Sequence, residues 1–220
     1  IRTDFPEKFG IPRQSRLACT KGMIVFEPEY RKEEAFRGLE EYSHIWLLWE
    51  FSEAVKETWS PTVRPPRLGG NIRKGVFATR SPFRPNPIGL SSVKLEGIEF
   101  TEEGPILHIL GADLMDGTPV YDIKPYLPYA DARADAKGGF ADAVFSHALE
   151  VDFPQELLDK LPKEKQKAAI AFLKQDPRPP YHNHADQIYK IAFDRWDIHF
   201  TVEGDRAGVC AVHTIQDAER

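Results

Sequence analysis

Two arginines in a proline-rich loop are the residues of this chain best suited to bind an acidic group. Arg80 and Arg84 lie within the segment 75–91, which also carries three prolines. A guanidinium group binds carboxylate or phosphate through two parallel hydrogen bonds, and proline stiffens the backbone that presents it. The segment therefore predicts an ordered anion-binding loop, although two surface ion pairs explain the same residues equally well.

A tight turn marks a second candidate site. The segment Asp113–Tyr126 contains an Asp-Gly turn signal at Asp116–Gly117, and such a turn exposes backbone groups to a ligand. Beyond the turn, the two-residue period of a strand places Asp122 and Lys124 on one face. An Asp-Gly-Thr-Pro sequence is, however, more often a turn without any ligand.

A third candidate is the N-terminal loop 9–14, in which Pro12 stiffens the backbone beside Arg13 and Gln14. An untethered loop is the simpler interpretation of these residues alone. Standard catalytic motifs are missing from the sequence: it has no phosphate loop, dinucleotide-binding glycine motif, nucleophile elbow or H-E-x-x-H motif. His182 and His184 form a close pair whose polar surroundings favour solvation over metal binding. We expect a site built from loops, without a metal.

The positive charges of the chain are concentrated in one stretch. The net charge is −5, yet residues 58–95 contain no Asp or Glu and carry +7, so the other 182 residues sum to −12. A solvated surface with chance clustering is one interpretation. We favour the other, an anion-binding face that attracts RNA to an otherwise acidic protein. The candidate RNA contacts are Arg64, Arg67, Arg73, Lys74 and Arg84, together with Lys124 outside the stretch.

Length and composition limit the classes of protein to which this chain can belong. A chain of 220 residues fits one large domain, or a main domain with a small companion. No apolar run approaches about 20 residues, which argues against a transmembrane helix. Cys19 and Cys210 lack metal-type spacing and predict free thiols in a cytoplasmic protein. We expect that the chain, which begins at Ile1 without methionine, has lost its true start.

Short strand signals dominate the first 145 residues. Apolar or alternating runs predict strands over 22–26, 44–51, 75–79, 93–100, 106–110 and 119–124, with a bulge at Gly97. One helix is predicted over 31–42, where apolar residues share a face. Many short strands with one helix favour a barrel or curled sheet over a Rossmann fold.

The pattern changes near residues 130–139, a small and polar segment that indicates a loop or a boundary. Beyond it, 154–161 and 163–175 predict helices separated at Pro162. Alternation over 196–202 and a turn at 203–208 predict a β-hairpin. We therefore predict a mainly β domain over 1–145 followed by a small α+β domain over 146–220.

Together, the motifs resemble one known family. The segments 59–71, 75–91, 116–128 and 176–179 are similar to those of the TsaA/YaeB-like family, which includes TrmO-type tRNA threonylcarbamoyladenosine methyltransferases. The resemblance covers nearly the whole chain. It implies a single-sheeted β-barrel methyltransferase domain, S-adenosylmethionine as cofactor, and a homodimer with the cofactor near the subunit interface. It also implies tRNA as substrate, with methyl transfer to the N6 nitrogen of threonylcarbamoyladenosine next to the anticodon.

The resemblance also assigns residues to the cofactor. Matched motif by motif, the contacts fall on Pro12, Arg13, Gln14, Ser52, Glu53, Arg80, Leu90, Asp116, Gly117, Thr118 and Pro119. Ser52 and Glu53 stand where enteric members carry His-Gln, which leaves a backbone role at that position. The acceptor nitrogen must lose a proton during transfer, and Asp122 or Asp116 is the candidate general base.

Two other functions stay open at this point. One is a non-catalytic barrel that binds S-adenosylmethionine or RNA as a sensor, and the other is a methyltransferase for another RNA or small-molecule acceptor. An arginine-rich loop and an Asp-Gly-Thr-Pro turn occur together in this chain, which favours the enzyme because a sensor needs one of them.

Overall fold

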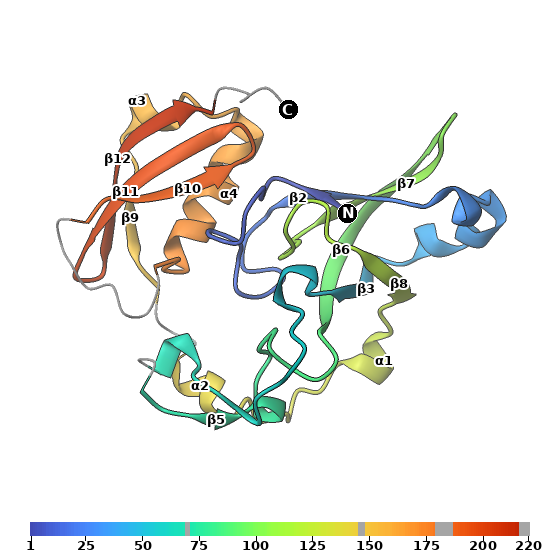
Figure 1. Ribbon diagram of the computed structural model, residues 1–220. Helices are drawn as coiled ribbons and strands as arrows, with labels where there is room; N and C mark the ends of the chain where they lie inside the picture. Colours follow the sequence, from blue (N-terminus) through green and yellow to red (C-terminus); the bar gives the residue numbers. More distant parts are fainter. Residues whose placement is uncertain (69–70, 145–147, 179–186, 216–220) are drawn as a thin grey trace.

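The protein folds around two β-sheets, as the computed structural model shows (Figure 1). The structure describes residues 1–68, 71–144, 148–178 and 187–215, without the side chains of Arg67, Ala143 and Val144. The first sheet belongs to the N-terminal part of the chain and the second to the C-terminal part.

The N-terminal sheet has six antiparallel strands in the order β1-β2-β7-β6-β3-β8. Their bounds are β1 Arg2–Thr3, β2 Lys21–Val25, β3 His44–Glu50, β6 Ile88–Thr101, β7 Gly104–Leu110 and β8 Val120–Pro125. The sheet curls into a half-barrel, which confirms the mainly β fold and the curled sheet predicted above (Figure 1). The predicted bulge is also confirmed, because the register of β6 against β7 shifts between Leu95 and Gly97.

One face of this sheet holds a hydrophobic core. On β3, Ile45, Leu47 and Trp49 are buried and alternate with half-buried neighbours. Gly89 pairs with Trp49 across β3 and β6, and a Cβ atom at Gly89 would occupy the space of the indole ring. Glycine at position 89 therefore leaves room for the indole ring of Trp49 against β6.

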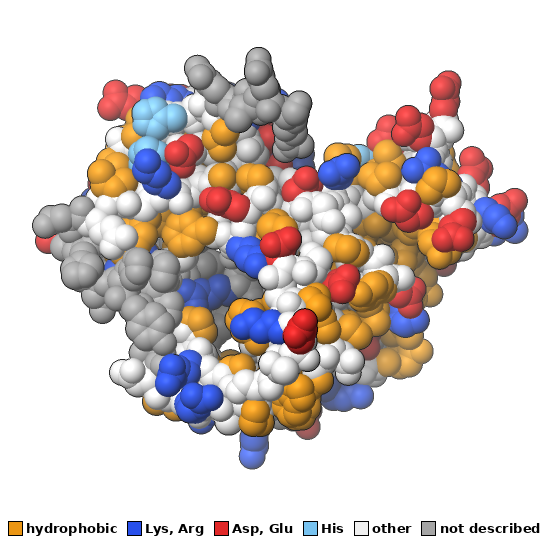
Figure 2. Space-filling view, viewed as in Figure 1, with side chains coloured by type: hydrophobic (Ala, Val, Ile, Leu, Met, Phe, Trp, Pro, Cys, Tyr) orange, Lys and Arg blue, Asp and Glu red, His pale blue; other side chains and the backbone are white. Residues whose placement is uncertain are grey.

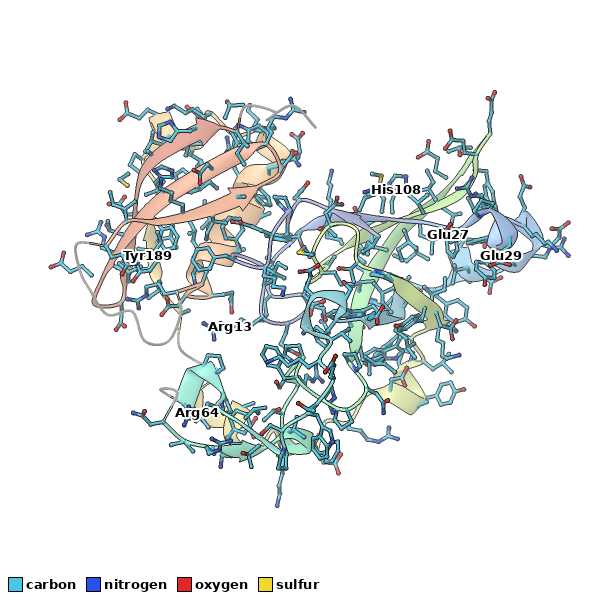
Figure 3. The ribbon with its side chains drawn as sticks, viewed as in Figure 1. Arg13, Glu27, Glu29, Arg64, His108 and Tyr189 are labelled. Atoms are coloured by element: carbon cyan, nitrogen blue, oxygen red, sulfur yellow. The ribbon has the colours of Figure 1, made fainter. Side chains whose placement is uncertain are left out.

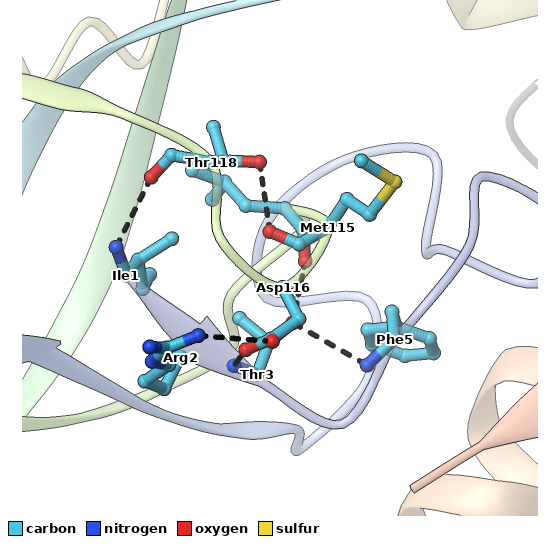
Figure 4. Close-up of polar contacts among 8 residues, drawn as sticks. Ile1, Arg2, Thr3, Phe5, Met115, Asp116 and Thr118 are labelled. Carbon is cyan, nitrogen blue, oxygen red and sulfur yellow. Dashed lines mark hydrogen bonds and ion pairs between the residues drawn. The ribbon is translucent and has the colours of Figure 1, made fainter. Parts of the chain in front are cut away.

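The N-terminal residues join the two ends of the curled sheet. The backbone nitrogen of Ile1 donates to the carbonyl oxygen of Thr118 over 3.0 Å, and the N–H of Gly117 donates to that of Ile1 over 2.9 Å (Figure 4). The N–H of Thr3 donates to the carboxylate of Asp116 over 2.9 Å. Strand β1, which pairs with β2, is thereby held to the turn that leads into β8.

Two predicted elements are wrong. The helix predicted over 31–42 consists of two short 3-10 turns, η2 Glu33–Phe36 and η3 Leu39–Glu41, because Gly38 between them has a left-handed φ of 86° that a helix cannot continue through. The strand predicted over 75–79 is the two-residue β5 (Lys74–Gly75) followed by the 3-10 turn η6 (Val76–Ala78). Val76 is buried there while Phe77 is 73% exposed, so the apolar run does not form one buried strand.

Loops and short elements carry residues 58–87 of the basic stretch, and its last residues, 88–95, belong to β6. β4 (Thr62–Val63) pairs with β5, and the 3-10 turn η5 (Pro66–Leu68) lies between them. The remaining short elements of the N-terminal part are η1 Pro28–Tyr30, η4 Ser52–Ala54, α1 Pro128–Asp131 and α2 Phe140–Val144. Among the described helices, none is long and apolar enough to cross a membrane.

The C-terminal sheet has the strand order β10-β11-β12-β9. Its elements are β9 Glu150–Asp152, α3 Gln155–Leu158, α4 Lys163–Lys174, β10 Tyr189–Phe193, β11 Trp196–Glu203 and β12 Arg206–Thr214. The helix break at Pro162 and the hairpin between β11 and β12 are confirmed.

The loop after β1 connects the two cores. Phe5 is fully buried among residues of the C-terminal core, with its ring 6.0 Å from that of Phe172 and 5.6 Å from that of Phe193. Lys165 of α4 pairs with Asp4 over 2.6 Å and with Asp194 over 2.5 Å. Burying a phenylalanine stabilises by about 1.5–3 kcal/mol, so this loop fixes the C-terminal helix α4 beside the half-barrel.

Candidate functional site

A cavity of about 1030 Å³ lies between the half-barrel, the N-terminal loop and the C-terminal domain. Residues from five segments that are far apart in the sequence line it, together with Pro66: 8–14, 49–54, 77–90, 113–118 and 172–178. The space-filling view shows a hollow near the middle of one face, with Lys and Arg side chains at its rim (Figure 2). The curled sheet therefore brings the three candidate loops of the sequence to one place.

Most of the residues that the resemblance assigns to the cofactor lie in the cavity wall. Those residues are Pro12, Arg13, Gln14, Ser52, Glu53, Arg80, Leu90 and Thr118. Arg84, expected to contact RNA, lines the same cavity. The cavity thus unites the N-terminal loop and the arginine loop, although 66 residues separate Gln14 from Arg80.

The arginine loop is held rigid by its own backbone. The N–H of Thr79 donates to the carbonyl oxygen of Val76 over 3.1 Å, which closes a turn directly before Arg80. Arg84 folds back and donates from Nη1 to the carbonyl oxygen of Thr79 over 3.1 Å. Arg80 reaches the other way and donates from Nη1 to Oε1 of Gln14 over 2.5 Å. The two guanidinium groups are therefore fixed before any ligand binds.

Asp113 is a carboxylate of the cavity wall, and the sequence places it in the candidate segment 113–126 without assigning it a role. It follows β7 and is half-buried, and Oγ of Ser91 donates to its Oδ1 over 2.6 Å. Burial raises the pKa of Asp113, while the hydrogen bond from Ser91, and more weakly the positive charge of Arg80, lower it. A carboxyl group with a raised pKa that faces a cavity is suited to accept a proton.

The structure places the two candidate general bases of the sequence outside the cavity. Asp116 accepts the N–H of Thr3 and pairs with Arg2 over 3.4 Å, so its carboxylate holds the N-terminal strand in place (Figure 4). Asp122 pairs with Lys124 over 2.9 Å on the exposed side of β8, as their shared strand face predicted. Neither Asp122 nor Lys124 lines the cavity.

The turn 116–119 faces the cavity only in part. Thr118 is buried and lines the cavity, whereas Gly117 and Pro119 do not line it. The N–H of Gly117 and the carbonyl oxygen of Thr118 bond to Ile1, and the carbonyl oxygen of Pro119 accepts the N–H of Glu50 over 3.1 Å. Most polar backbone groups of this turn are therefore already hydrogen-bonded within the protein.

The C-terminal domain supplies one wall of the cavity. Phe172, Gln175, Pro177 and Arg178 line it, and Arg178 forms a two-pronged pair with Asp176 over 2.7 and 2.9 Å. Arg13, which lies between the C-terminal domain and the half-barrel (Figure 3), donates from Nη2 to the carbonyl oxygen of Asp176 over 2.7 Å. The cavity is thus complete because the two domains are in contact.

The basic stretch extends from the cavity along β4 and β5. Arg64 and Arg73 are exposed, and Arg73 donates from Nε to Oγ1 of Thr62 over 2.8 Å. Lys74 lies on β5, with its Nζ 5.9 Å from the centre of the Phe140 ring. Figure 3 shows Arg64 on the loop beside β5. The side chain of Arg67 lies outside the described residues, as do His182 and His184.

The cavity lining suits a ligand that combines an apolar ring system with charged groups. Pockets for small molecules typically occupy about 300–1,000 Å³ and have mostly apolar walls with a few placed polar groups. Phe51, Phe83 and Leu90 supply apolar surface, the arginines supply cations, and Asp113 supplies an anion. Within the described part of the chain, no cluster of three His, Cys, Asp or Glu side chains could hold a metal ion.

Comparison with known proteins gives matches over both domains. Residues 1–132 match the family model described as tRNA-methyltransferase O N-terminal domain, and residues 146–215 match the TrmO C-terminal domain. The chain is 45% identical over 188 residues to a tRNA (adenine(37)-N6)-methyltransferase of Escherichia coli, covering 82% of this chain and 80% of that relative. It is 43% identical over 209 residues to a putative S-adenosylmethionine-dependent methyltransferase of Pseudomonas aeruginosa, covering 91% of this chain and 88% of that one. A solved structure of TrmO from Pseudomonas aeruginosa matches with a TM-score of 0.75 at 37% identity, covering 96% of this chain and 94% of the other.

Proposed function

This chain belongs to the tRNA-methyltransferase O family, and on that premise we propose that it transfers a methyl group from S-adenosylmethionine to the N6 nitrogen of the adenosine next to the anticodon in tRNA. The observation that carries the proposal is the hydrogen bond between Arg80 and Gln14. It joins the two loops that family resemblance assigns to the cofactor, in the wall of one cavity. We further propose that the acceptor adenosine carries a threonylcarbamoyl group.

The residues of the cavity fit S-adenosylmethionine. When bound, this cofactor supplies an electrophilic methyl group on a sulfonium centre. Arg80 and the backbone near Pro12–Gln14 line the cavity and would hold its carboxylate, since a guanidinium group binds carboxylate in two-pronged fashion. Leu90 and Phe51 give apolar surface for the adenine ring, and Asp113 gives a negative charge that complements the cofactor's cationic groups.

Asp113 replaces Asp116 and Asp122 as our candidate general base. The N6 nitrogen lies between a purine and a carbonyl group, so it is a weak nucleophile that must lose its proton during transfer. A positioned base contributes about 10²–10⁴-fold to such a reaction. Holding the acceptor in line with the methyl group contributes more, about 7–11 kcal/mol in favourable cases.

We propose that the basic stretch binds the tRNA backbone. The protein has a net charge of −5, but Arg64 and Arg73 lie on the loop that joins β4 and β5, and Lys74 lies on β5. Local positive charge attracts RNA even to an acidic protein, and phosphate contacts dominate the affinity of such complexes. The substrate would therefore approach with its anticodon loop toward the cavity, in the cytoplasm.

A homodimer is part of the proposal. Ile88 and Leu90 on β6 and Tyr121 on β8 are at least half exposed, and these two strands flank β3. Large apolar side chains that share a face of a sheet favour burial against a partner. Leu90 also lines the cavity, which is consistent with a cofactor close to the subunit interface.

Labelled S-adenosylmethionine tests the proposed function. We expect label in tRNA that carries threonylcarbamoyl groups, with no metal added, and much less label in tRNA that lacks them. Cofactor binding without any transfer would instead indicate a sensor, and equal labelling of both tRNAs would indicate another acceptor.

A further inference from the structure

Three aromatic side chains at the cavity mouth are exposed to water, and we propose that they stack on the unpaired bases that flank the acceptor adenosine in the anticodon loop. The group consists of Trp59, Phe77 and Phe83, which we call the aromatic platform. The proposal rests on the proposed function, because it takes single-stranded RNA as the occupant of this surface.

These rings are exposed, although the protein has cores that bury other aromatic side chains. Trp59 is 50% exposed, Phe77 is 73% exposed and Phe83 is 46% exposed. Phe5, Phe172, Phe193 and Phe200 are completely buried. An exposed apolar cluster of this kind marks a binding surface more often than a solvated one.

The backbone holds the platform in place. The N–H of Val76 donates to the carbonyl oxygen of Pro61 over 2.9 Å, and this bond ties the segment after Trp59 to the turn that carries Phe77. The two rings lie 6.0 Å apart between their centres, with an angle of 39° between their planes. Because Val76 is buried beneath the turn, Phe77 is presented outward from a fixed point.

The surroundings of the rings are cationic. Lys56 Nζ lies 4.4 Å from the centre of the Phe83 ring, and Arg84 follows Phe83 directly. Residues 58–95, which carry all three rings, contain no acidic side chain. Exposed aromatic rings among cations are the arrangement by which proteins bind single-stranded nucleic acid, since each base offers a face for stacking and each phosphate a charge.

The position of the platform determines which bases stack on it. Phe77 and Phe83 line the cavity, while Trp59 lies beyond Phe77 and is not part of the cavity wall. If the acceptor base enters the cavity, its neighbours in the anticodon loop come to lie at the mouth, against these rings. Stacking there would hold the loop open and keep the acceptor unstacked from the adjacent bases.

A fluorescent stem-loop tests the platform. The probe is a synthetic anticodon stem-loop with 2-aminopurine beside the acceptor, since this base loses fluorescence when it stacks. We expect wild-type protein to change the signal, and Phe77→Ala or Trp59→Ala to raise the dissociation constant by about 5- to 150-fold, the range for one lost stacking contact. Phe77→Tyr should retain the affinity. The slope of log affinity against log salt should stay unchanged, because no charge is lost.

Phe100→Ala is the matched control. Phe100 is 55% exposed but lies at the far end of β6, away from the cavity, so its removal should leave RNA binding unchanged. Calorimetry should show unchanged binding of S-adenosylmethionine in Trp59→Ala, because Trp59 is not part of the cavity wall.

Two results would overturn the platform. One is unchanged stem-loop affinity in Phe77→Ala and Trp59→Ala. The other is dissociation of a dimer into monomers by the same variants in ultracentrifugation, which would assign the rings to an interface between two copies of the chain. Failure of the proposed function is distinguishable, because it appears as absent methyl transfer by the wild-type protein, whatever the stem-loop signal.

Discussion

Ser91 donates a hydrogen bond from Oγ to Oδ1 of Asp113 over 2.6 Å, and this contact orients the Asp113 carboxylate in the cavity wall. The same Oγ accepts a hydrogen bond from Nε1 of Trp49 over 3.0 Å. Trp49 is in turn fixed by its fit against Gly89. The orientation of Asp113 is thus set from the core of the half-barrel, and a group held in this way can act as a base without a change in conformation.

Replacing Asp113 by asparagine tests its role in proton transfer. We expect Asp113→Asn to lower single-turnover methyl transfer by about 10²–10⁴-fold, the usual contribution of a general base. The loss of methyl transfer should not result from unfolding of the Asp113→Asn protein. Since burial raises the pKa of Asp113 above its unfolded value, the folded protein loses stability as pH rises through that pKa, and asparagine removes this cost at neutral pH. An Asp113→Asn protein that melts no lower and still transfers methyl at the wild-type rate would exclude Asp113 as the base.

The hydrogen bond from Ser91 should tune the pH dependence of the reaction. Because this bond lowers the pKa of Asp113, Ser91→Ala should raise that pKa and move the acidic limb of the kcat/KM profile to higher pH. Ser92→Ala is the matched control, since Ser92 is the neighbour on the opposite face of β6 and should leave the profile in place. Superimposable profiles for Ser91→Ala and wild type would mean that the acidic limb of the profile reports the pKa of a group other than Asp113.

Arg80 should contribute directly to cofactor affinity. We expect Arg80→Ala to weaken binding of S-adenosylmethionine by about 1.5–3 kcal/mol, the value of a hydrogen bond to a charged group. Arg80→Lys should recover part of the loss, because an ammonium group keeps the charge but not the two-pronged geometry. Isothermal calorimetry measures both variants, and wild-type affinity in a folded Arg80→Ala protein would remove Arg80 from the cofactor site.

The sequence was sufficient for features that depend on local patterns. Alternation along 44–51 predicts β3, Pro162 predicts the helix break, and Gly97 predicts the bulge of β6, because each follows from the stereochemistry of a few adjacent residues. The helix predicted over 31–42 failed at Gly38, whose left-handed backbone outweighs the apolar face around it.

The site required information that no local pattern contains. Asp116 and Asp113 are three residues apart and chemically alike, yet one holds the N-terminal strand and the other faces the cavity. What separates them is the position of Thr3 and of Ser91, which lie far away in the sequence and come close through the curl of the sheet. The wall contributed by α4 likewise depends on packing of Phe5 between two domains.

The basic stretch should account for the salt dependence of tRNA binding. Reversing the charge of Arg64, Arg67 and Lys74 together should raise the dissociation constant for tRNA and leave cofactor affinity nearly unchanged. If the three contact phosphates, the slope of log affinity against log salt should fall in magnitude by roughly two to three units. A control with equal charge change uses three exposed lysines of α4, Lys163, Lys167 and Lys174. An unchanged slope in the first variant would show that the basic stretch is a solvated surface that does not contact the tRNA phosphates.

Arg84 should distinguish modified from unmodified tRNA. The threonylcarbamoyl group carries its own carboxylate, and a cation beside the acceptor is needed to recognise it. Arg84 and Lys124 are both candidate RNA contacts from the sequence, and the structure places Arg84 in the cavity wall but Lys124 outside it, paired with Asp122 over 2.9 Å. We therefore expect Arg84→Ala to abolish the preference for modified tRNA, a change of about 30-fold to several thousand-fold given that such a charged pair is worth 2–5 kcal/mol. Lys124→Ala should leave the preference intact and serves as the control. Turnover on both tRNAs measures the preference, and if Arg84→Ala slowed both to the same extent, its guanidinium group would contact a feature that the two tRNAs share, such as a phosphate.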